Sequence, residues 1–302
     1  MKNAHVDAAP ATIAVARRPA GRLGDYAALA KPRLNVLVVA SSAAGYYLAS
    51  SSAPQLAPMA LAVGGTALVA GGAAVLNQVY ERDTDALMMR TRMRPLPDRR
   101  VGVDEARAFG IVLATAGIAV LSFSANLPSA LVAAATLAIY LAIYTPLKRR
   151  SAISTVVGAV PGALPPLIGW TAGRGAIDAG GWALFAIVFL WQIPHFMAIA
   201  WMYRDDYRRA GFPMLPVVEP DGARTGRQAV LYAAALVPVS LVPAVVGVAG
   251  NAYFWFALAL GLSFFVLSAR FARVRSEARA RALFYGSLLY LPLIWAAMIL
   301  DH

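Results

Sequence analysis

Apolar segments about 20 residues long alternate with short polar connections along the chain from residue 34 onward. A helix of that length, rising about 1.5 Å per residue, crosses a hydrocarbon layer about 30 Å thick. Such segments are too long for barrel strands, and lipid accepts only helices and closed barrels because every backbone polar group must be satisfied. The pattern therefore predicts nine membrane-spanning helices, at residues 34–50, 56–77, 103–123, 127–147, 152–172, 181–202, 229–249, 251–270 and 282–300.

The predicted fold is all-α, with a single transmembrane domain from residue 31 to residue 302. Residues 1–30 are rich in Ala and Arg and lack the apolar core of a signal peptide, so we expect a flexible cytoplasmic segment. Composition agrees with a membrane protein, since 60 % of the 302 residues are apolar and 14 % are charged. The absence of cysteine excludes a disulfide framework, a thiol nucleophile and a thiolate metal site.

The net charge of +12 is distributed in short basic clusters between the apolar segments. This distribution is typical of topology signals and of contact with anionic lipid or substrate, so we do not expect nucleic acid as a partner. With the N-terminus in the cytoplasm, 26 of the 27 Lys and Arg residues lie on the cytoplasmic side, and only Arg174 lies outside. The positive-inside rule therefore predicts a cytoplasmic N-terminus and an external C-terminus.

The stretch NQVYERDTDALMMRTRMRPLP, residues 77–97, carries the main candidate chemistry. Asn77, Glu81 and Asp85 recur every fourth residue, so on a continuing helix they share one face. Mg²⁺ is commonly held by one or two carboxylates together with the phosphate oxygens of a substrate, and the arginines that follow can bind the remaining oxygens. The pattern predicts a metal-dependent phosphate site; a solvated, salt-bridged loop is the alternative.

A second acidic stretch, RDDYRRAGFPMLPVV, follows the sixth predicted span, so two acidic helix ends can face each other across one cavity mouth. The same span places Gln192 and His195 roughly two to three turns inside the membrane. Polar groups at that depth usually face the protein interior and serve function; a neutral, hydrogen-bonded core histidine is the alternative for His195.

The fifth predicted span contains the segment GAVPGALPPLIGW, which combines three prolines with three glycines. We expect a kinked helix that faces the protein interior. Two interpretations are open, because irregular backbone can line a water-filled cavity and small residues can also serve close helix packing.

Taken in order, these stretches resemble the UbiA superfamily of intramembrane prenyltransferases. The motifs that carry the resemblance are KPR at 31–33, the acidic ladder followed by RMRPLP, YTPLKRRS at 144–151 and the second acidic stretch. Within the superfamily, NQVYERDTD, WQIPHF and RDDYRRAGFPMLPVV are similar to the branch that farnesylates haem. The resemblance runs from about residue 31 to the C-terminus. It implies a nine-helix bundle around a lipid-accessible central cavity, in a bacterial inner membrane, with the active site on the cytoplasmic side.

The reaction implied is the Mg²⁺-dependent transfer of a farnesyl group from farnesyl diphosphate to a vinyl group of haem B (protohaem IX), giving haem O. The implied partners are these two substrates and the lipid bilayer, and a downstream haem-modifying membrane enzyme could receive the product. The resemblance assigns catalysis and Mg²⁺ binding to four residues: Asn77, Glu81, Asp85 and Asp206. Substrate binding falls to four others: Arg33, Arg94, Lys148 and His195.

The chain departs from the superfamily pattern at the second acidic stretch. Many relatives carry a second acid pair spaced by four, whereas Asp206 has Met202 and Ala210 at those positions. Only Asp206 is therefore carried over, with Asp205 as the second choice.

Two other functions compete with this prediction. A prenyltransferase of the same superfamily could act on a quinone precursor or another aromatic acceptor. A secondary transporter would need ionisable groups near the bilayer midplane on broken helices, but nearly all the acids lie at the cytoplasmic edge, and His195 is the one titratable group predicted well inside.

Overall fold

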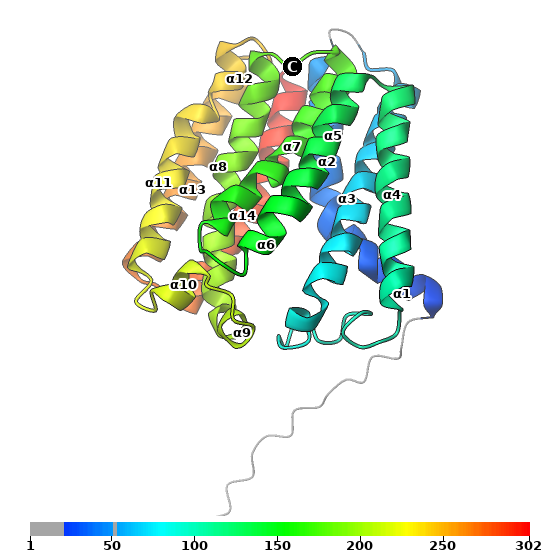
Figure 1. Cartoon of the computed structure of the whole chain (residues 1–302). Coiled ribbons are helices and arrows are strands. Elements are labelled where there is room, and N and C mark those ends of the chain that lie inside the picture. Colours follow the sequence, from blue (N-terminus) through cyan, green and yellow to red (C-terminus); the bar gives the residue numbers. More distant parts are fainter. Residues whose placement is uncertain (1–20, 51–52) are drawn as a thin grey trace, which may run out of the picture.

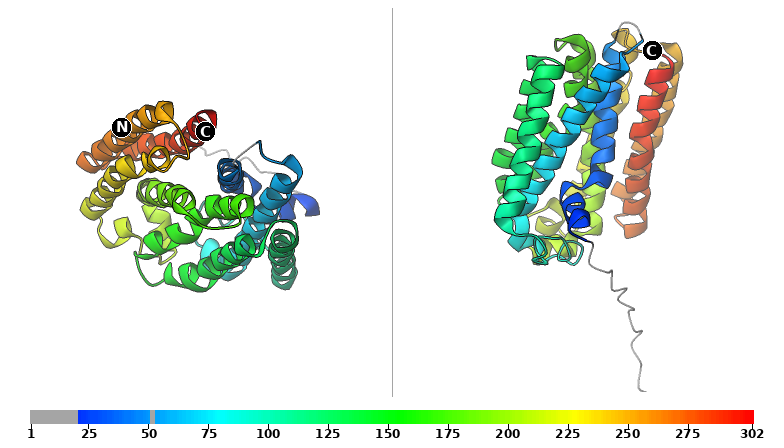
Figure 2. Two further views of the ribbon diagram at one scale, coloured as in Figure 1. Left: turned by 90° about the horizontal axis from the view of Figure 1, so that it is seen from above. Right: turned by 90° about the vertical axis from the view of Figure 1, so that its right-hand side faces the viewer.

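The structure is a computed structural model that describes residues 21–50 and 53–302. Over these residues the chain forms helices and contains no strand, so the all-α prediction is confirmed. The long helices lie side by side in one bundle, and the C-terminus lies at the end opposite the short helices α9 and α10 (Figure 1). Most of the expected flexible segment, residues 1–20, lies outside the described residues. Its last part forms helix α1 (Arg22–Ala30), below α2 in the right-hand view of Figure 2.

Eight helices of the described chain are long and apolar enough to cross a membrane, which makes this a polytopic membrane protein. Two of them are composite: one joins α5 (Leu127–Ala138), the π-helical segment η1 (Ile139–Tyr144) and α6 (Thr145–Leu147), and the other joins α11 (Ala223–Val239) and α12 (Val242–Val245). The remaining six are α3 (Leu56–Asp85), α4 (Val103–Ser124), α7 (Ser154–Arg174), α8 (Ala179–Met202), α13 (Asn251–Arg273) and α14 (Glu277–Leu300).

Helix α2 (Pro32–Ala49) matches the first predicted span but is not among these eight. It is 18 residues long, close to the lower limit for a span. It also carries Arg33, Asn35 and the buried hydroxyls of Ser41 and Ser42, which lower its hydropathy. Because α2 packs inside the bundle against α3 and α7, it shares the architecture of the spans. The count of nine spans stays a prediction.

Helix α3 continues beyond residue 77, the predicted end of the second span, as far as Asp85. Residues 77–85 contain neither Gly nor Pro, so nothing in the local sequence stops the helix there. The prediction that the acidic ladder lies on a continuing helix is therefore confirmed.

Helix α7 runs unbroken across its three prolines, and most of its central part is buried. A Cβ atom on Gly169 would overlap the carbonyl oxygen of Ser42, and one on Gly45 would overlap that of Pro166. The backbones of α2 and α7 are thus in direct contact, which only residues without a side chain allow. The interior position expected for this helix is confirmed, and close packing of small residues is the interpretation that the contacts support.

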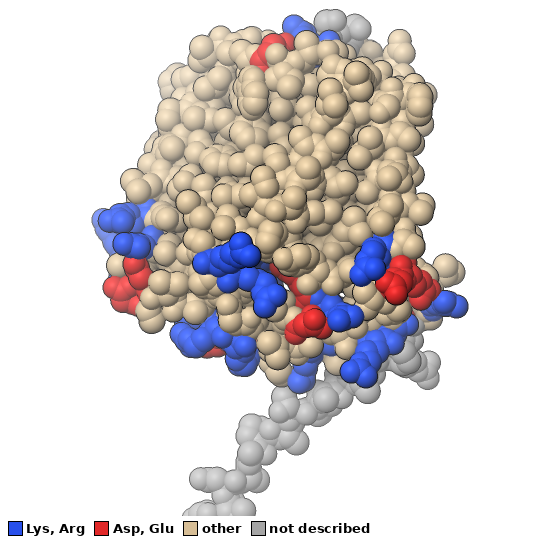
Figure 3. Space-filling view, viewed as in Figure 1, with Lys and Arg blue, Asp and Glu red and all other residues tan. Residues whose placement is uncertain are grey.

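Charged side chains gather at one end of the molecule, around α9 (Arg204–Arg209) and α10 (Leu215–Val218), while the broad middle of the visible face carries none (Figure 3). An uncharged band flanked by a basic end is the pattern that a bilayer selects. The asymmetry supports the predicted orientation, with the basic end in the cytoplasm, and this orientation stays a prediction.

Candidate active site

The end of α3 nearest the basic end of the bundle presents three polar side chains on one buried face. Asn77 and Glu81 are each 4 % exposed, and Asp85 is 1 % exposed. Since four residues make slightly more than one helical turn, the three lie in a nearly straight row. Burial of carboxylates without partners is costly, so the neighbours of this row decide what it can do.

Glu81 is paired with Lys148, whose Nζ donates to both carboxylate oxygens at 3.0 and 3.1 Å. Burial is the largest single influence on Lys148 and lowers its pKa, but the charge and hydrogen bond of Glu81 act together with Tyr207 and Tyr140, and the net shift of the lysine pKa is upward. Lys148 therefore stays protonated beside the acid.

The π-helical segment η1 brings the partners of α3 into position. The hydroxyl of Thr145 donates to the carbonyl of Tyr140, five residues earlier, at 2.8 Å. The same hydroxyl oxygen accepts a hydrogen bond of 3.2 Å from Nδ2 of Asn77. One π-helical turn shifts the face of the following residues and is often found at functional sites. Here it allows Thr145 and Lys148 to meet Asn77 and Glu81.

Asp85 has one satisfied and one unsatisfied carboxylate oxygen. Its Oδ2 accepts a hydrogen bond of 2.7 Å from Arg94, and the hydroxyl of Thr91 donates to its backbone carbonyl at 2.7 Å. Its Oδ1 is buried and has no hydrogen-bond partner among the residues that the structure describes. A buried carboxylate oxygen left without a donor is unusual, and a cation is the natural partner for it.

Asp206 lies on α9 and links the two acidic stretches. Its Oδ1 accepts a hydrogen bond of 3.3 Å from the backbone N–H of Met89 and pairs with Arg209. The guanidinium of Arg90 lies 5.0 and 4.9 Å from the ring centres of Tyr203 and Tyr207. The two acidic ends therefore face each other as the sequence predicts. Asp205, the second choice, is exposed and pairs with Arg208 at 2.6 Å.

Across residues 21–50 and 53–302, no group of three or more acidic, histidine or cysteine side chains could hold a metal ion alone. The structure does bring Asn77, Glu81 and Asp85 together on one buried face of α3. Asp206 is held separately, on α9, by its contacts with Met89 and Arg209. A Mg²⁺ ion bound jointly with a diphosphate needs only one or two carboxylates. Glu81 and the unsatisfied oxygen of Asp85 fit that requirement.

The KPR motif lies at the turn between α1 and α2, where Lys31 has left-handed backbone angles of φ 50° and ψ 52°. Arg33 is exposed, and no ion pair or side-chain hydrogen bond of Arg33 is found in the described part of the chain. Burial of the Lys31 ammonium, followed by the positive charge of Arg94, lowers the pKa of Lys31 to about 7. Asp85 and Glu81 also act on this ammonium group. Lys31, rather than Arg33, therefore lies within electrostatic range of the carboxylates.

His195 lies on α8 and contacts α14, and none of its hydrogen bonds or ring contacts within the described part of the chain is with the acidic row. Its Nδ1 is 2.7 Å from the hydroxyl oxygen of Ser287. Its ring stacks with those of Trp191 and Phe284, with centroid distances of 5.2 and 5.1 Å. Gln192 is buried, and its amide donates to the Ala159 carbonyl at 3.0 Å. Gln192 is therefore occupied in helix packing, whereas His195 is only half-buried.

Two aromatic residues join the site that the sequence analysis did not select. Tyr140 and Tyr144 lie on η1 with ring centres 5.3 Å apart, and Glu81 acts electrostatically on both. Gly158 on α7 leaves room for the Tyr144 ring, because a Cβ there would overlap it. The four-residue spacing of Tyr140, Tyr144 and Lys148 is the signal that could have identified them.

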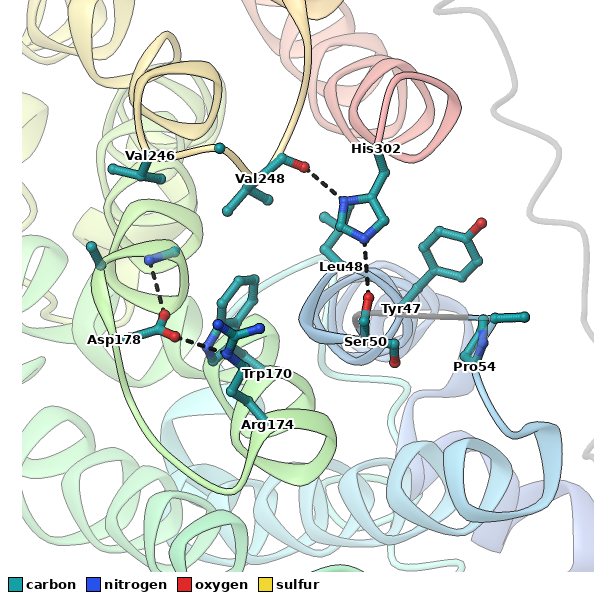
Figure 4. Close-up of a pocket in the computed structure, with 14 residues that line it drawn as sticks. Tyr47, Leu48, Ser50, Pro54, Trp170, Arg174, Asp178, Val246, Val248 and His302 are labelled. Carbon is teal, nitrogen blue, oxygen red and sulfur yellow. Dashed lines mark hydrogen bonds and ion pairs between the residues drawn. The ribbon is translucent and has the colours of Figure 1, made fainter.

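A cavity of about 880 Å³ opens at the opposite end of the bundle, beside the C-terminus (Figure 4). Its walls include the Arg174–Asp178 ion pair, at 3.1 Å, and His302, whose Nδ1 lies 2.8 Å from the Val248 carbonyl oxygen. It contains none of the predicted site residues, so the candidate site rests on the acidic end of α3.

Comparison of the chain with known proteins identifies its family. The profile of the UbiA prenyltransferase family matches residues 38–294. The chain belongs to the UbiA prenyltransferase family. A relative from Solibacter usitatus, named protoheme IX farnesyltransferase, is 49 % identical over 287 residues, which cover 92 % of this chain and 98 % of the relative. A relative of the same name from Koribacter versatilis is 43 % identical over 293 residues, 94 % of each chain.

Solved structures of UbiA-type proteins share the fold. A digeranylgeranylglyceryl phosphate synthase superposes with a TM-score of 0.78 at 17 % identity, covering 92 % of this chain and 98 % of that one. A UbiA homologue from Archaeoglobus fulgidus bound to GPP and Mg²⁺ superposes with a TM-score of 0.66 at 18 % identity, covering 91 % and 99 %. At these identities the likeness establishes the fold alone, and it confirms the predicted UbiA-type architecture.

Proposed function

We propose that this UbiA-family prenyltransferase transfers a farnesyl group from farnesyl diphosphate to a vinyl group of haem B, giving haem O and diphosphate. The relatives named protoheme IX farnesyltransferase, which match nearly the whole chain, support haem as the acceptor. The observation that carries the proposal is the pairing of Glu81 with Lys148 and of Asp85 with Arg94 on one face of α3. It supplies acids for a metal and cations for a diphosphate at the same place.

Glu81 and Asp85 would hold Mg²⁺, with the side chain of Asn77 beside them and Asp206 at the meeting point of the two loops. When bound, the ion would neutralise the negative charge that grows on the departing diphosphate. The A. fulgidus homologue, which is described as bound to GPP and Mg²⁺, supports this assignment. The unsatisfied Oδ1 of Asp85 supports it independently, because that oxygen lacks a hydrogen-bond partner in the described part of the chain.

Arg94 and Lys148 would bind the diphosphate oxygens, because both are cationic and already fixed beside the acids. Fixed cations stabilise a leaving group more effectively than cations that must first be oriented. Lys31 adds a further positive group within the same electrostatic field. We also retain the predicted contact of Arg33 with the diphosphate, although this residue is exposed at the start of α2.

The prenyl tail would lie among the spans, where burial contributes about 0.8 kcal/mol per methylene group. Loss of diphosphate leaves positive charge on the allylic carbon, and the haem vinyl group forms a new bond to that carbon. Water then adds to the cation on the former vinyl group and releases a proton, which leaves a hydroxyethylfarnesyl side chain. Tyr140 and Tyr144 precede Lys148 on the same helical segment by about two turns and one turn, so their rings would lie on the membrane side of the diphosphate and would keep water from the first cation.

His195 is proposed to bind the haem. It lies within α8, about two turns from the cytoplasmic end of that helix, whereas the diphosphate site lies at the end of α3. A haem entering beside the prenyl tail could reach this depth. The reaction is proposed to take place at the cytoplasmic side of a bacterial inner membrane, from which haem O could pass to a haem-modifying membrane enzyme.

The test is a choice of substrates offered to the purified protein in liposomes. One reaction contains farnesyl diphosphate and haem B, and the other contains 4-hydroxybenzoate and a longer prenyl diphosphate, each with Mg²⁺ or with EDTA. We expect haem O in the first reaction only, and only with Mg²⁺. Prenylated 4-hydroxybenzoate would instead establish the quinone-precursor alternative, and a product in neither reaction would refute the proposed activity.

A further inference from the structure

Ser287 on α14 takes part in two short hydrogen bonds that fix the positions of their protons. Its hydroxyl donates to the carbonyl of Phe284 at 2.5 Å, and its oxygen lies 2.7 Å from Nδ1 of His195. A carbonyl can only accept, and a serine hydroxyl carries one proton. Since that proton is given to Phe284, the proton between Ser287 and His195 must come from Nδ1–H of the imidazole.

The neutral imidazole of His195 therefore carries its free lone pair on Nε2. Within residues 21–50 and 53–302, Nε2 makes no hydrogen bond, and it is not among the enclosed polar atoms without a partner. The ring plane is also held by stacking, because the rings of Trp191 and Phe284 lie 5.2 and 5.1 Å from it at interplanar angles of 21° and 27°. Trp191 is itself held by α14, since its indole N–H donates to the Ser287 carbonyl at 2.8 Å.

We propose that Ser287 is a positioning residue that presents Nε2 of His195 as an axial ligand to the iron of the haem acceptor. This inference rests on the proposed function. An imidazole whose other ring nitrogen donates to a fixed acceptor is the usual arrangement of a metal-binding histidine. A contact with a haem propionate would instead need an N–H at Nε2, which this hydrogen-bond arrangement does not supply.

Ligation at iron also suits the reaction. The vinyl groups lie on the rim of the macrocycle, so a haem held through its centre keeps that rim free to approach the farnesyl donor. Ser287 acts on the acceptor only through His195, so its loss should alter haem binding and leave donor binding unchanged.

The experiment is a titration of the purified protein in detergent with ferric haem B, without the prenyl donor, followed by optical absorption and electron paramagnetic resonance. The variants are His195→Ala and Ser287→Ala. Ser268→Ala is the matched control, because Ser268 is also fully buried and its hydroxyl donates only to a carbonyl of its own helix, that of Phe264, at 3.1 Å. Gel filtration confirms that each variant is folded.

We expect His195→Ala to lose the spectrum of a nitrogen-ligated haem, and added imidazole to restore it. Ser287→Ala should weaken haem binding by about tenfold, whereas Ser268→Ala should match the wild type. A wild-type spectrum in His195→Ala, or wild-type affinity in Ser287→Ala, would overturn the inference and leave the proposed function standing if haem O is still made. Ligation in the wild type without any farnesyl transfer would refute the proposed function alone, and absence of haem binding would refute both.

Discussion

The ammonium group of Lys148 lies within 3.0 and 3.1 Å of the two carboxylate oxygens of Glu81, although 67 residues separate them in sequence. Both side chains are largely buried, with 13 % of Lys148 and 3 % of Glu81 exposed. Removing one partner of such a pair leaves a buried charge, whereas removing both costs far less. The pair therefore fixes a cation at the donor site and couples α3 to the segment that follows η1.

This coupling can be measured by a double-mutant cycle. Glu81→Gln and Lys148→Met should each lower the free energy of unfolding by about 3–5 kcal/mol, and the double variant should lose much less than the sum. Denaturation of the purified protein in detergent provides the measurement. The control is Glu277→Gln, whose exposed pair with Arg281 should contribute less than about 1 kcal/mol. Additive losses at Glu81 and Lys148 would show that the pair is not coupled.

A comparison of the variants Asp85→Asn and Asp83→Asn distinguishes the loss of a metal ligand from the loss of a negative charge in general. Asp85→Asn removes a buried carboxylate that has an unsatisfied oxygen, so activity should fall by about 100-fold or more while the protein stays folded. Asp83→Asn is the matched control, because Asp83 lies on the same helix with its side chain 85 % exposed and should keep nearly full activity. The measurement is initial rate against Mg²⁺ concentration. Equal losses in the two variants would argue against metal binding by the buried row.

Lys31 should make donor binding depend on pH. Its pKa is lowered to about 7 by burial and by Arg94, so its positive charge is present below that pH and is lost as the pH rises. Since a bound diphosphate favours the charged form, the affinity for farnesyl diphosphate should weaken by up to about tenfold per pH unit above 7. Equilibrium binding from about pH 6 to about pH 9 checks this.

The control for this pH effect is Lys31→Arg, because a guanidinium stays charged over the whole range. Its donor affinity should lack the additional fall above pH 7 that the wild type shows, and titration of the diphosphate itself affects both proteins alike. Parallel pH profiles of the wild type and Lys31→Arg would exclude Lys31 from the donor site.

The orientation of the bundle can be tested with single cysteines, because the chain contains none. Asn251 lies exposed at the start of α13, and Ala278 lies exposed in the first turn of α14, at the opposite end of the bundle. In intact cells a membrane-impermeant thiol reagent should label Asn251→Cys, and should label Ala278→Cys only after permeabilisation. The reverse pattern would invert the orientation predicted from the basic residues.

The sequence predicted those parts of the site that depend on one helix. Asn77, Glu81 and Asp85 could be placed together because helical periodicity alone brings them to one face. The pairing of Glu81 with Lys148 could not, because it depends on the π-helical turn of η1, which spacing does not reveal. The position of Lys31 depends on a left-handed backbone at a non-glycine residue, which is rare and has no simple sequence signal.

Contacts between distant helices could not be predicted either, because spacing along the sequence does not show how separate elements pack against each other. His195 could be recognised as a polar residue within a span, but its bond to Ser287 joins α8 to α14 across 92 positions. Asp206 could be assigned to the second acidic stretch, but its contact with the Met89 backbone requires two loops to fold against each other. In each case the missing information was the register between elements rather than the identity of the residues.

The most direct test of the proposed activity is the mass of the haem extracted from cells that lack haem O, with and without this chain. Cells with the wild-type chain should contain a haem in which one vinyl group has become a hydroxyethylfarnesyl group, and cells with Asp85→Asn should contain almost none. Haem B alone, in cells where the wild-type protein is present in the membrane and farnesyl diphosphate is available, would contradict the assignment of this site to haem farnesylation.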